Sequence, residues 1–243
     1  YLTANVVIDE YWRCHNSIVL CLNGHTITFL EAKDSTTNGG VTITSDTTFT
    51  LCDCSKKQTG KITGSTRSGV NVSGSTAIFN MYGGKITGNS HKGTNTDSNA
   101  YGGGVRVRSK GAFNMYGGEI SGNTCAGRYY SYGGGVCVED KGSIFNMYGG
   151  KITDNAHTNG GGVGNSGTFT MYAGEITGNT ANSGSFAEGG GVYSYGTFIM
   201  RGGSITGNHA NIPGASYNIG GISNRGTFLV SGKVTISGND GSN

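Results

Sequence analysis

The acidic side chains are the first candidates for chemistry, and their spacing argues against catalysis. The chain of 243 residues has 14 Asp and Glu residues, and most of them fall at repeated or turn positions. Glu139 and Asp140 form the only adjacent acidic pair in the repeated region, and the Lys-Gly after them is typical of a turn. Glycosidases need two carboxylates facing one bond, and calcium-dependent lyases need clustered acids. We therefore predict no catalytic residue and keep enzymatic activity as the less favoured class.

The cysteines are candidates for metal or redox chemistry. Their number, 6, is compatible with an oxidising compartment, although their spacing matches no compact disulfide scaffold. Cys52 and Cys54 form a C-x-C motif without the second pair or the histidines of a zinc site, so we predict no metal site and no cofactor. Cys125 and Cys137 begin and end one variable segment and are the disulfide candidates. A bridge from Cys21 to Cys52 is the alternative.

Aromatic and histidine side chains in the segments of variable length are candidates for ligand binding. Flat rings with polar neighbours could stack on sugar rings or contact a protein. The simpler interpretation is that loops have drifted in length and use tyrosine to cover apolar edges, and we give it slightly more weight. The candidates are Tyr101, Tyr129, Tyr130, Tyr132, Phe186, His209 and Tyr217.

A second aromatic set repeats along the chain instead of lying in the loops. Such a column could form a platform for a polysaccharide, but a stacking ladder that stabilises a sheet is the favoured interpretation. Its members are Tyr82, Tyr116, Tyr148 and Tyr172.

An internal repeat must position all of these residues. The phrase F-x-M-[YR]-[GA]-G-x-I-[TS]-[GD]-N recurs, and the only variable stretch lies between its closing Asn and the next G-G-G-V or G-G-I. A constant frame with one variable corner is typical of a parallel β-helix, because an insertion at a corner leaves neighbouring rungs in register. The phrase begins at Phe79, Phe113, Phe145, Phe169 and Phe198, with a degenerate copy at Phe228.

Within each rung, apolar and polar residues alternate as strands require. In the V-R-V-R segment at residues 105–108 we expect the valines to point inward and the arginines outward. In F-N-M-Y at residues 113–116 the Phe and Met should point inward, and a third strand contains Ile120. The sequence therefore predicts an all-β, right-handed parallel β-helix with three short strands per rung and about eight rungs, as one domain over residues 1–243.

Equivalent positions should form columns along the axis of such a solenoid. The asparagines from Asn89 through Asn239 would form a hydrogen-bonded corner ladder. Charges before the inward isoleucines alternate in sign, so in-register stacking would place unlike charges together. These residues are Lys85, Glu119, Lys151 and Glu175, and Arg108 with Glu139 is a further matched pair.

Composition excludes several classes of protein. The 47 glycines come with only 1 proline and 13% charged residues, which fits neither collagen nor a disordered chain. A formal net charge of +3 with scattered Lys and Arg makes nucleic acid an unfavoured partner. No apolar run is long enough for a membrane span, and the start at Tyr1 has no signal-peptide pattern. Both boundaries read as cuts in a longer chain.

The repeat resembles two groups of bacterial surface proteins. G-G-G-V at Gly102, Gly133, Gly160 and Gly189, and I-x-x-N from Ile86, are similar to the G-G-A-[ILV] and F-x-x-N motifs of chlamydial polymorphic outer-membrane repeats, over roughly residues 70–239. The chain also resembles the glycine-rich β-helix repeats of Gram-positive surface proteins, which open like the segment at residues 20–27.

The resemblance implies an extracellular role at the bacterial surface or as a secreted protein. It implies an adhesin or a glycan-binding or protein-binding module in a larger surface protein, with a host or microbial glycan or a surface protein as partner. A carbohydrate-active enzyme of the pectin-lyase-like β-helix class and a purely structural stalk are the alternatives.

Overall fold

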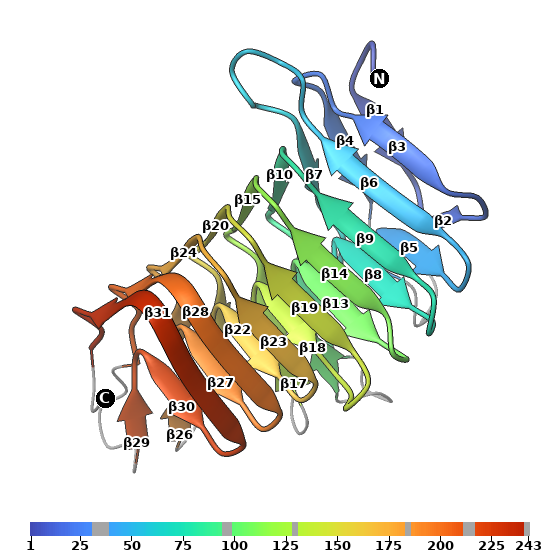
Figure 1. The fold of residues 1–243 in the computed structure, drawn as a ribbon. Helices are drawn as coiled ribbons and strands as arrows, with labels where there is room; N and C mark the ends of the chain where they lie inside the picture. The colour runs from blue at the N-terminus through green and yellow to red at the C-terminus, as the bar shows by residue number, and fades with distance from the viewer. Residues whose placement is uncertain (31–38, 94–98, 128–130, 183–185, 211–216, 241–243) are drawn as a thin grey trace.

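The structure, a computed structural model, describes residues 1–30, 39–93, 99–127, 131–182, 186–210 and 217–240, without the side chains of Ser131, Phe186 and Tyr217. All regular secondary structure in these ranges is β-strand (Figure 1). Neighbouring strands are parallel, and the chain winds through about seven turns of a β-solenoid. In the same ranges no helix is long and apolar enough to cross a membrane.

One eight-stranded sheet runs the length of the solenoid. Its central strands begin with the valines of the G-G-G-V motifs, so each glycine-rich corner leads directly into this sheet. Its strands are, in spatial order, β2 (Trp12–Cys14), β5 (Val41–Thr44), β8 (Val70–Ser73), β13 (Val105–Arg108), β18 (Val136–Val138), β22 (Val163–Asn165), β27 (Val192–Ser194) and β30 (Ile222–Asn224).

The F-x-M and K-I-T segments form the two arms of a second, larger sheet, which β28 (Thr197–Thr206) and β31 (Thr227–Ser237) join around a corner. The first arm contains β3 (Ile18–Cys21), β6 (Thr48–Cys52), β9 (Ile78–Met81), β14 (Ala112–Met115), β19 (Ile144–Met147) and β23 (Thr168–Met171). The second contains β1 (Val6–Ile8), β4 (Thr26–Phe29), β7 (Lys61–Thr63), β10 (Lys85–Thr87), β15 (Glu119–Ser121), β20 (Lys151–Thr153) and β24 (Glu175–Thr177).

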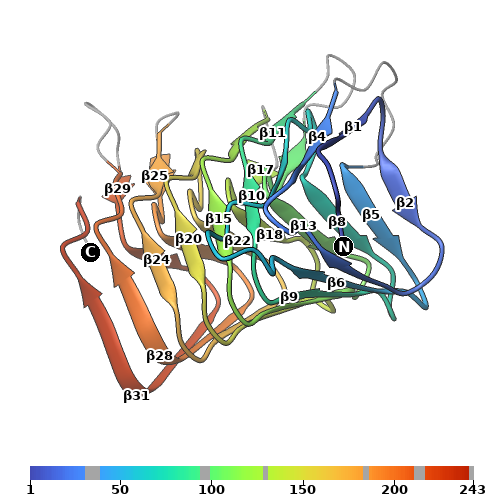
Figure 2. The same cartoon turned by 90° about the horizontal axis from the view of Figure 1, so that it is seen from above.

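The variable segments carry short strands of their own. These are β11 (Ser90–Lys92), β16 (Thr124–Ala126), β21 (Ala156–His157) and β25 (Thr180–Ala181) in one sheet, and the pairs β12 (Ala100–Tyr101) with β17 (Ser131–Tyr132) and β26 (Phe186–Glu188) with β29 (Tyr217–Ile219). The number of strands therefore differs between turns, and the described residues of the turn that starts at Val105 contain five, β13 to β17. Figure 2 shows the successive turns stacked along one axis.

Like residues stack on like residues in the core. Phe79, Phe113 and Phe145 are register partners in β9, β14 and β19, and their rings stack with centroids 4.8 Å apart. Val105 and Val107 are fully buried, as are Phe113 and Met115, which confirms the inward positions predicted from the alternation. Burying one such side chain contributes about 1.5–3 kcal/mol, so the repeated columns supply most of the stabilising apolar contact.

The closing asparagines form the predicted corner ladder. The side-chain amide of Asn123 donates to Oδ1 of Asn155 at 3.0 Å, and the same oxygen accepts the backbone N–H of Asn123 at 3.0 Å. The amide of Asn155 in turn donates to Asn179 and to the carbonyl of Ile120. Because a buried amide without partners is costly, this pattern explains why asparagine recurs at this corner from Asn89 to Asn239.

The glycine triplets allow the chain to return beside this ladder. Gly133 has φ +73°, and a Cβ on Gly134 would lie 2.5 Å from the carbonyl oxygen of Ala156. A Cβ on Gly135 would lie 3.0 Å from the side-chain amide of Asn155. Only glycine permits this backbone approach, so the G-G-G-V motif is a packing motif.

The disulfide prediction is corrected. The structure joins Cys21 to Cys54 with their Cα atoms 6.0 Å apart, and it leaves Cys125 and Cys137 as buried free thiols. Cys137 has no exposed surface, because the variable segments cover the outward side of its strand, and burial raises the pKa of both thiols. Each thiol fills part of this packed layer as a small apolar side chain instead of closing the loop.

Candidate functional site

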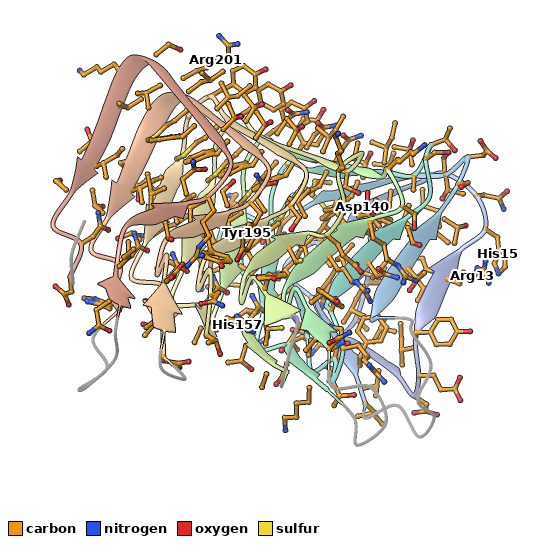
Figure 3. The ribbon with its side chains drawn as sticks, turned by 90° about the horizontal axis from the view of Figure 1, so that it is seen from below. Arg13, His15, Asp140, His157, Tyr195 and Arg201 are labelled. Atoms are coloured by element: carbon orange, nitrogen blue, oxygen red, sulfur yellow. A yellow bond between two sulfur atoms is a disulfide. The ribbon has the colours of Figure 1, made fainter. Side chains whose placement is uncertain are left out.

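The outward side of the eight-stranded sheet, here called the loop face, is the candidate site. Side chains alternate between the two sides of a strand, so each strand of this sheet has an outward residue near its middle. These outward residues are register partners from strand to strand. The column reads Arg13, Thr42, Asn71, Arg106, Cys137, Gly164, Tyr193 and Ser223. Seven of the eight are buried, all except Arg13, and the short strands of the variable segments place Tyr101 over Arg106 and Tyr132 over Gly164. Figure 3 shows this face.

The structure brings some of the predicted binding residues together on this face. Tyr101 and Tyr132 are register partners in β12 and β17, and both are half-buried. Phe186 and Tyr217 are backbone partners in β26 and β29. The variable segments therefore stack in register like the frame, although their sequences differ.

Of the remaining predicted binding residues, His209 is not brought to this group. His209 is exposed beside β25 and pairs through Nδ1 with the carboxylate of Asp240. Tyr129 and Tyr130 lie outside the described residues.

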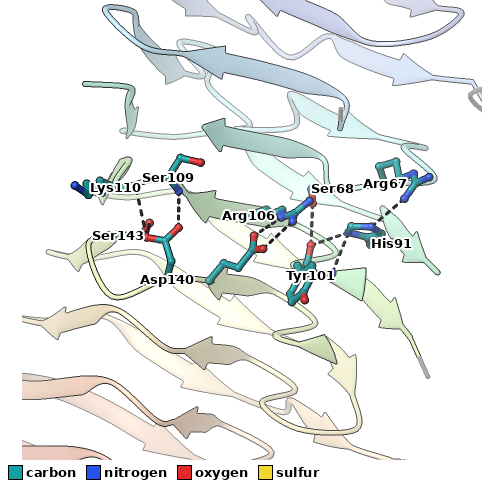
Figure 4. Close-up of polar contacts among 10 residues, drawn as sticks. Arg67, Ser68, His91, Tyr101, Arg106, Ser109, Lys110, Asp140 and Ser143 are labelled. Carbon is teal, nitrogen blue, oxygen red and sulfur yellow. Dashed lines mark hydrogen bonds and ion pairs between the residues drawn. The ribbon is translucent and has the colours of Figure 1, made fainter. Parts of the chain in front are cut away.

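A buried ion pair lies at the centre of the loop face (Figure 4). Arg106 donates from Nε to Oε2 of Glu139 at 2.7 Å and from Nη2 to Oε1 at 3.0 Å. The ring of Tyr101 covers the guanidinium at 4.7 Å from its centroid. Burial opposes the charge of Arg106, but the hydrogen bond and charge of Glu139 outweigh it and raise the pKa of Arg106. Glu139 thus pairs with Arg106, and the predicted match with Arg108 is wrong. The two carboxylate oxygens of Glu139 bind the guanidinium of Arg106 in a bidentate geometry, although Arg106 belongs to the neighbouring column of side chains.

The other carboxylate of the predicted acidic pair stabilises a turn. Asp140 accepts the backbone N–H of Ser109 and the hydroxyl of Ser143, the latter at 2.9 Å (Figure 4). Glu139 and Asp140 therefore hold different parts of the frame and do not face a common bond, which agrees with the turn interpretation of this segment.

Hydrogen bonds with His91 and Ser68 hold Tyr101 beside this ion pair. His91 lies between the segments, where its Nδ1 is 2.7 Å from the carbonyl oxygen and 3.1 Å from the backbone nitrogen of Tyr101, and its Nε2 is 3.4 Å from Nη1 of Arg67 (Figure 4). Ser68 donates its hydroxyl to the carbonyl of Tyr101 at 3.0 Å. These bonds fix the position of Tyr101 relative to the frame.

A tyrosine cluster lies farther along the same face. The rings of Tyr132 and Tyr193 are 5.7 Å apart on the two sides of Gly164, which leaves space for them because it has no side chain. Tyr195 meets both rings edge to face, at 6.1 Å from Tyr132 and 5.1 Å from Tyr193. Tyr193 is buried, whereas 45% of Tyr195 is exposed, so one ring of this tyrosine cluster is partly open to solvent.

A fixed arginine borders the tyrosine cluster. Arg225 donates from Nη2 to Oε1 of Glu188 at 2.6 Å and lies 5.8 Å from the centroid of the Tyr195 ring. Glu188 is buried and also accepts the hydroxyl of Ser223 at 3.0 Å. The hydrogen bond to Glu188 raises the pKa of Arg225 and holds its half-exposed guanidinium in one place.

Sequence reasoning missed four residues of this arrangement: Tyr193, Tyr195, Arg225 and Glu188. A signal was present, because the sequence has tyrosine at 193 and 195, where the preceding turn has Gly164 and Ser166. Aromatic residues at outward positions that differ from turn to turn are therefore the feature that marks this part of the face.

The aromatic column on the other sheet has a different geometry. The rings of Tyr82, Tyr116, Tyr148 and Tyr172 stack nearly parallel with centroids 4.5, 4.9 and 4.7 Å apart. Their hydroxyl edges are exposed, but each interior ring is covered on both faces by its neighbours. This geometry matches the predicted stacking ladder, because a sugar would need an open ring face.

Neither a metal site nor a protein family can be assigned to the chain. Among the residues that the structure describes, no group of three or more His, Cys, Asp and Glu side chains could hold a metal ion. No protein-family model matches the chain, and the searches of curated proteins and of solved structures return no significant match.

Proposed function

We propose that this chain is a non-catalytic binding module of an extracellular bacterial surface protein and that it binds a glycan through the tyrosine cluster. The exposed ring of Tyr195 carries the proposal, because it stands beside the fixed guanidinium of Arg225. A rigid aromatic surface next to an oriented donor is the common arrangement for recognising a sugar ring and its hydroxyls. The Cys21–Cys54 bond is compatible with an oxidising, extracellular location.

The proposal includes the finer features of the fold. We infer right-handed winding, because parallel strands joined by a crossover are right-handed in about 98% of cases. We also infer that three strands per turn form the shared frame and that the variable segments add the others. The stacked register of β12 with β17 and of β26 with β29 supports this division.

Catalysis is less favoured because the acids of the loop face already have structural partners. Glu139 is paired with Arg106, Asp140 caps a turn, and Glu188 is buried against Arg225. A glycosidase would need two carboxylates directed at one bond.

A glycan array probed with the 243-residue chain and two variants tests the proposal. We expect the parent chain to bind at least one glycan class without turnover, and Tyr195→Ala to weaken that binding about tenfold or more. Tyr148→Ala is the matched control, because it removes the same side chain from the stacked column, and should bind like the parent. Absence of binding to every glycan would favour a structural stalk, and release of new chain ends would show an enzyme.

A further inference from the structure

The loop face has a second open region, near its N-terminal end. Here the variable segments leave a groove of about 440 Å³, lined by Arg13, Thr42, Thr44, Ser45, Ser73 and Arg108. The lining residues come from β2, β5, β8 and β13 and the turn after β5, so the groove crosses four neighbouring strands. At a strand spacing of about 4.8 Å it extends roughly 14 Å along the solenoid. Figure 3 shows Arg13 near the N-terminal end and Tyr195 farther along the ribbon.

The two arginines of this groove differ from the other arginines of the loop face. Arg106 and Arg225 each form an ion pair with a glutamate, whereas neither Arg13 nor Arg108 has an ion pair within the described ranges. The lining contains hydroxyls but no carboxylate. Burial, followed by the nearby charge of Arg106, lowers the pKa of Arg108, and the charges of Glu139 and Asp140 offset only part of this effect.

Unsatisfied polar atoms lie in and beside the groove. Nε of Arg108 is buried without a hydrogen-bond partner, and so are both amide atoms of Asn71, in the part of the chain that is described. Asn71 is 1% exposed, is the register partner of Thr42, and lies two residues before Ser73 on the same side of β8. Buried polar atoms are nearly always paired, so these groups have hydrogen-bonding capacity left for water or for a polar ligand.

We propose that the groove binds the acidic groups, carboxylate or sulfate, of an extended polysaccharide. Arginine presents a planar fork of donors that matches an oxyanion with two parallel hydrogen bonds. The two guanidiniums would bind successive acidic groups, while the hydroxyls of Thr44, Ser45 and Ser73 exchange hydrogen bonds with sugar hydroxyls. This inference rests on the proposed glycan-binding function and adds the class of glycan and a second contact region.

Calorimetric titration with four probes of similar length tests the inference: a uronate oligosaccharide, a sulfated oligosaccharide, a neutral oligosaccharide and a polyglutamate peptide. We expect one or both acidic saccharides to bind more tightly than the neutral one, with affinity falling as salt rises. Arg108→Gln should weaken acidic binding about tenfold or more, because a charge-assisted hydrogen bond is lost. Arg13→Gln, at an exposed position that should not affect folding, should weaken it in the same direction.

Arg201→Gln is the matched control, since it removes one exposed positive charge on β28 outside the groove. It should leave the affinity within about twofold if local contacts and not net charge drive binding. Equal losses in all three variants, or equal binding of acidic and neutral saccharides, would overturn the inference. Preferential binding of the peptide would overturn the saccharide assignment. Neutral binding that depends on Tyr195 alone would leave the proposed function intact and reject the groove.

Discussion

The stacked tyrosine column and the tyrosine cluster use the same residue type in opposite ways. In the column, Tyr116 and Tyr148 are related by the repeat, so their rings are parallel and cover each other. In the cluster, Tyr193 and Tyr195 meet at an interplanar angle of 86°, and the partly exposed ring of Tyr195 has the guanidinium of Arg225 over it. Repeated tyrosines therefore cover one another and stabilise the frame, whereas tyrosines at positions that differ from turn to turn meet at an angle and do not form a continuous stack.

The largest expected effect comes from breaking the repeated core. Met147 is fully buried between its register partners Met115 and Met171, so Met147→Asp would place a carboxylate among apolar side chains. An unpaired buried charge costs at least several kcal/mol, comparable with the whole stability of many domains. We expect no cooperative thermal transition in circular dichroism.

Ile144→Asp is the control for this variant, because it introduces the same charge into the same strand at an exposed position. It should melt close to the parent chain. A Met147→Asp variant that also melts within a few degrees of the parent would contradict the inward position of the methionine.

The second prediction concerns pH and the layer beneath the variable segments. His157 is buried, accepts the N–H of Asn159 at Nδ1, and has its pKa lowered by burial to about 4. The unfolded chain, with an ordinary histidine pKa near 6.5, binds the proton more readily, so stability should fall as pH drops from about 6.5 to 4, by roughly 3 kcal/mol.

Denaturant titrations at pH 7 and pH 4.5 check this dependence. His157→Gln should remove most of the histidine contribution, whereas His15→Gln, which replaces an exposed histidine, should retain it. An identical pH dependence in the parent chain and in His157→Gln would mean that the buried histidine does not titrate as described.

A smaller effect should separate the two tyrosine arrangements. Tyr148 stacks on Tyr116 and Tyr172, so Tyr148→Ala should destabilise the chain by about 1–2 kcal/mol in chemical denaturation. Its affinity for any glycan that the parent chain binds should stay within about twofold. Weaker glycan binding of about tenfold would instead make the column a binding platform and remove the contrast with the tyrosine cluster.

The smallest effect is expected in the charge column. Lys85, Glu119, Lys151 and Glu175 are register partners as predicted, and Lys85 lies 3.0 Å from Glu119. These side chains are partly exposed, so Glu119→Gln should cost less than about 1 kcal/mol, and the difference should disappear in about 1 M salt. A larger loss that persists in high salt would show that the column carries more of the stability than its exposure suggests.

The sequence predicts the frame because each frame position sees the same surroundings at every turn. Alternation correctly assigned Val105 and Phe113 to the interior, and the recurrent asparagine indicated the ladder. It also assigned Cys137 to the outward side of its strand, but the side chain is buried there. A period of two tells which side of a sheet a residue occupies and says nothing of what covers that side.

The candidate site was less predictable because it is built from contacts between segments that do not repeat. Arg106 and Glu139 are diagonal neighbours, and register alone favoured Arg108. The pairing of Arg225 with Glu188 joins residues from separate variable and frame segments, so no single motif contains both. Cys21 bonds to Cys54 and not to its register partner Cys52, because the chain turns after β6.

The asparagine ladder also aligns the dipoles of its side-chain amides along the solenoid axis. From Asn89 to Asn208 each side-chain amide of the ladder donates to the asparagine of the next turn, and the row ends at Asn239, so the amide dipoles align head to tail. Aligned hydrogen-bonded dipoles polarise one another and strengthen the row cooperatively. Each variable segment begins directly after one asparagine of this ladder. A segment can therefore change in length or composition while the residue from which it leaves the frame keeps its position along the solenoid axis. The solenoid thus holds surface segments of different sequence at regular spacings along one hydrogen-bonded row.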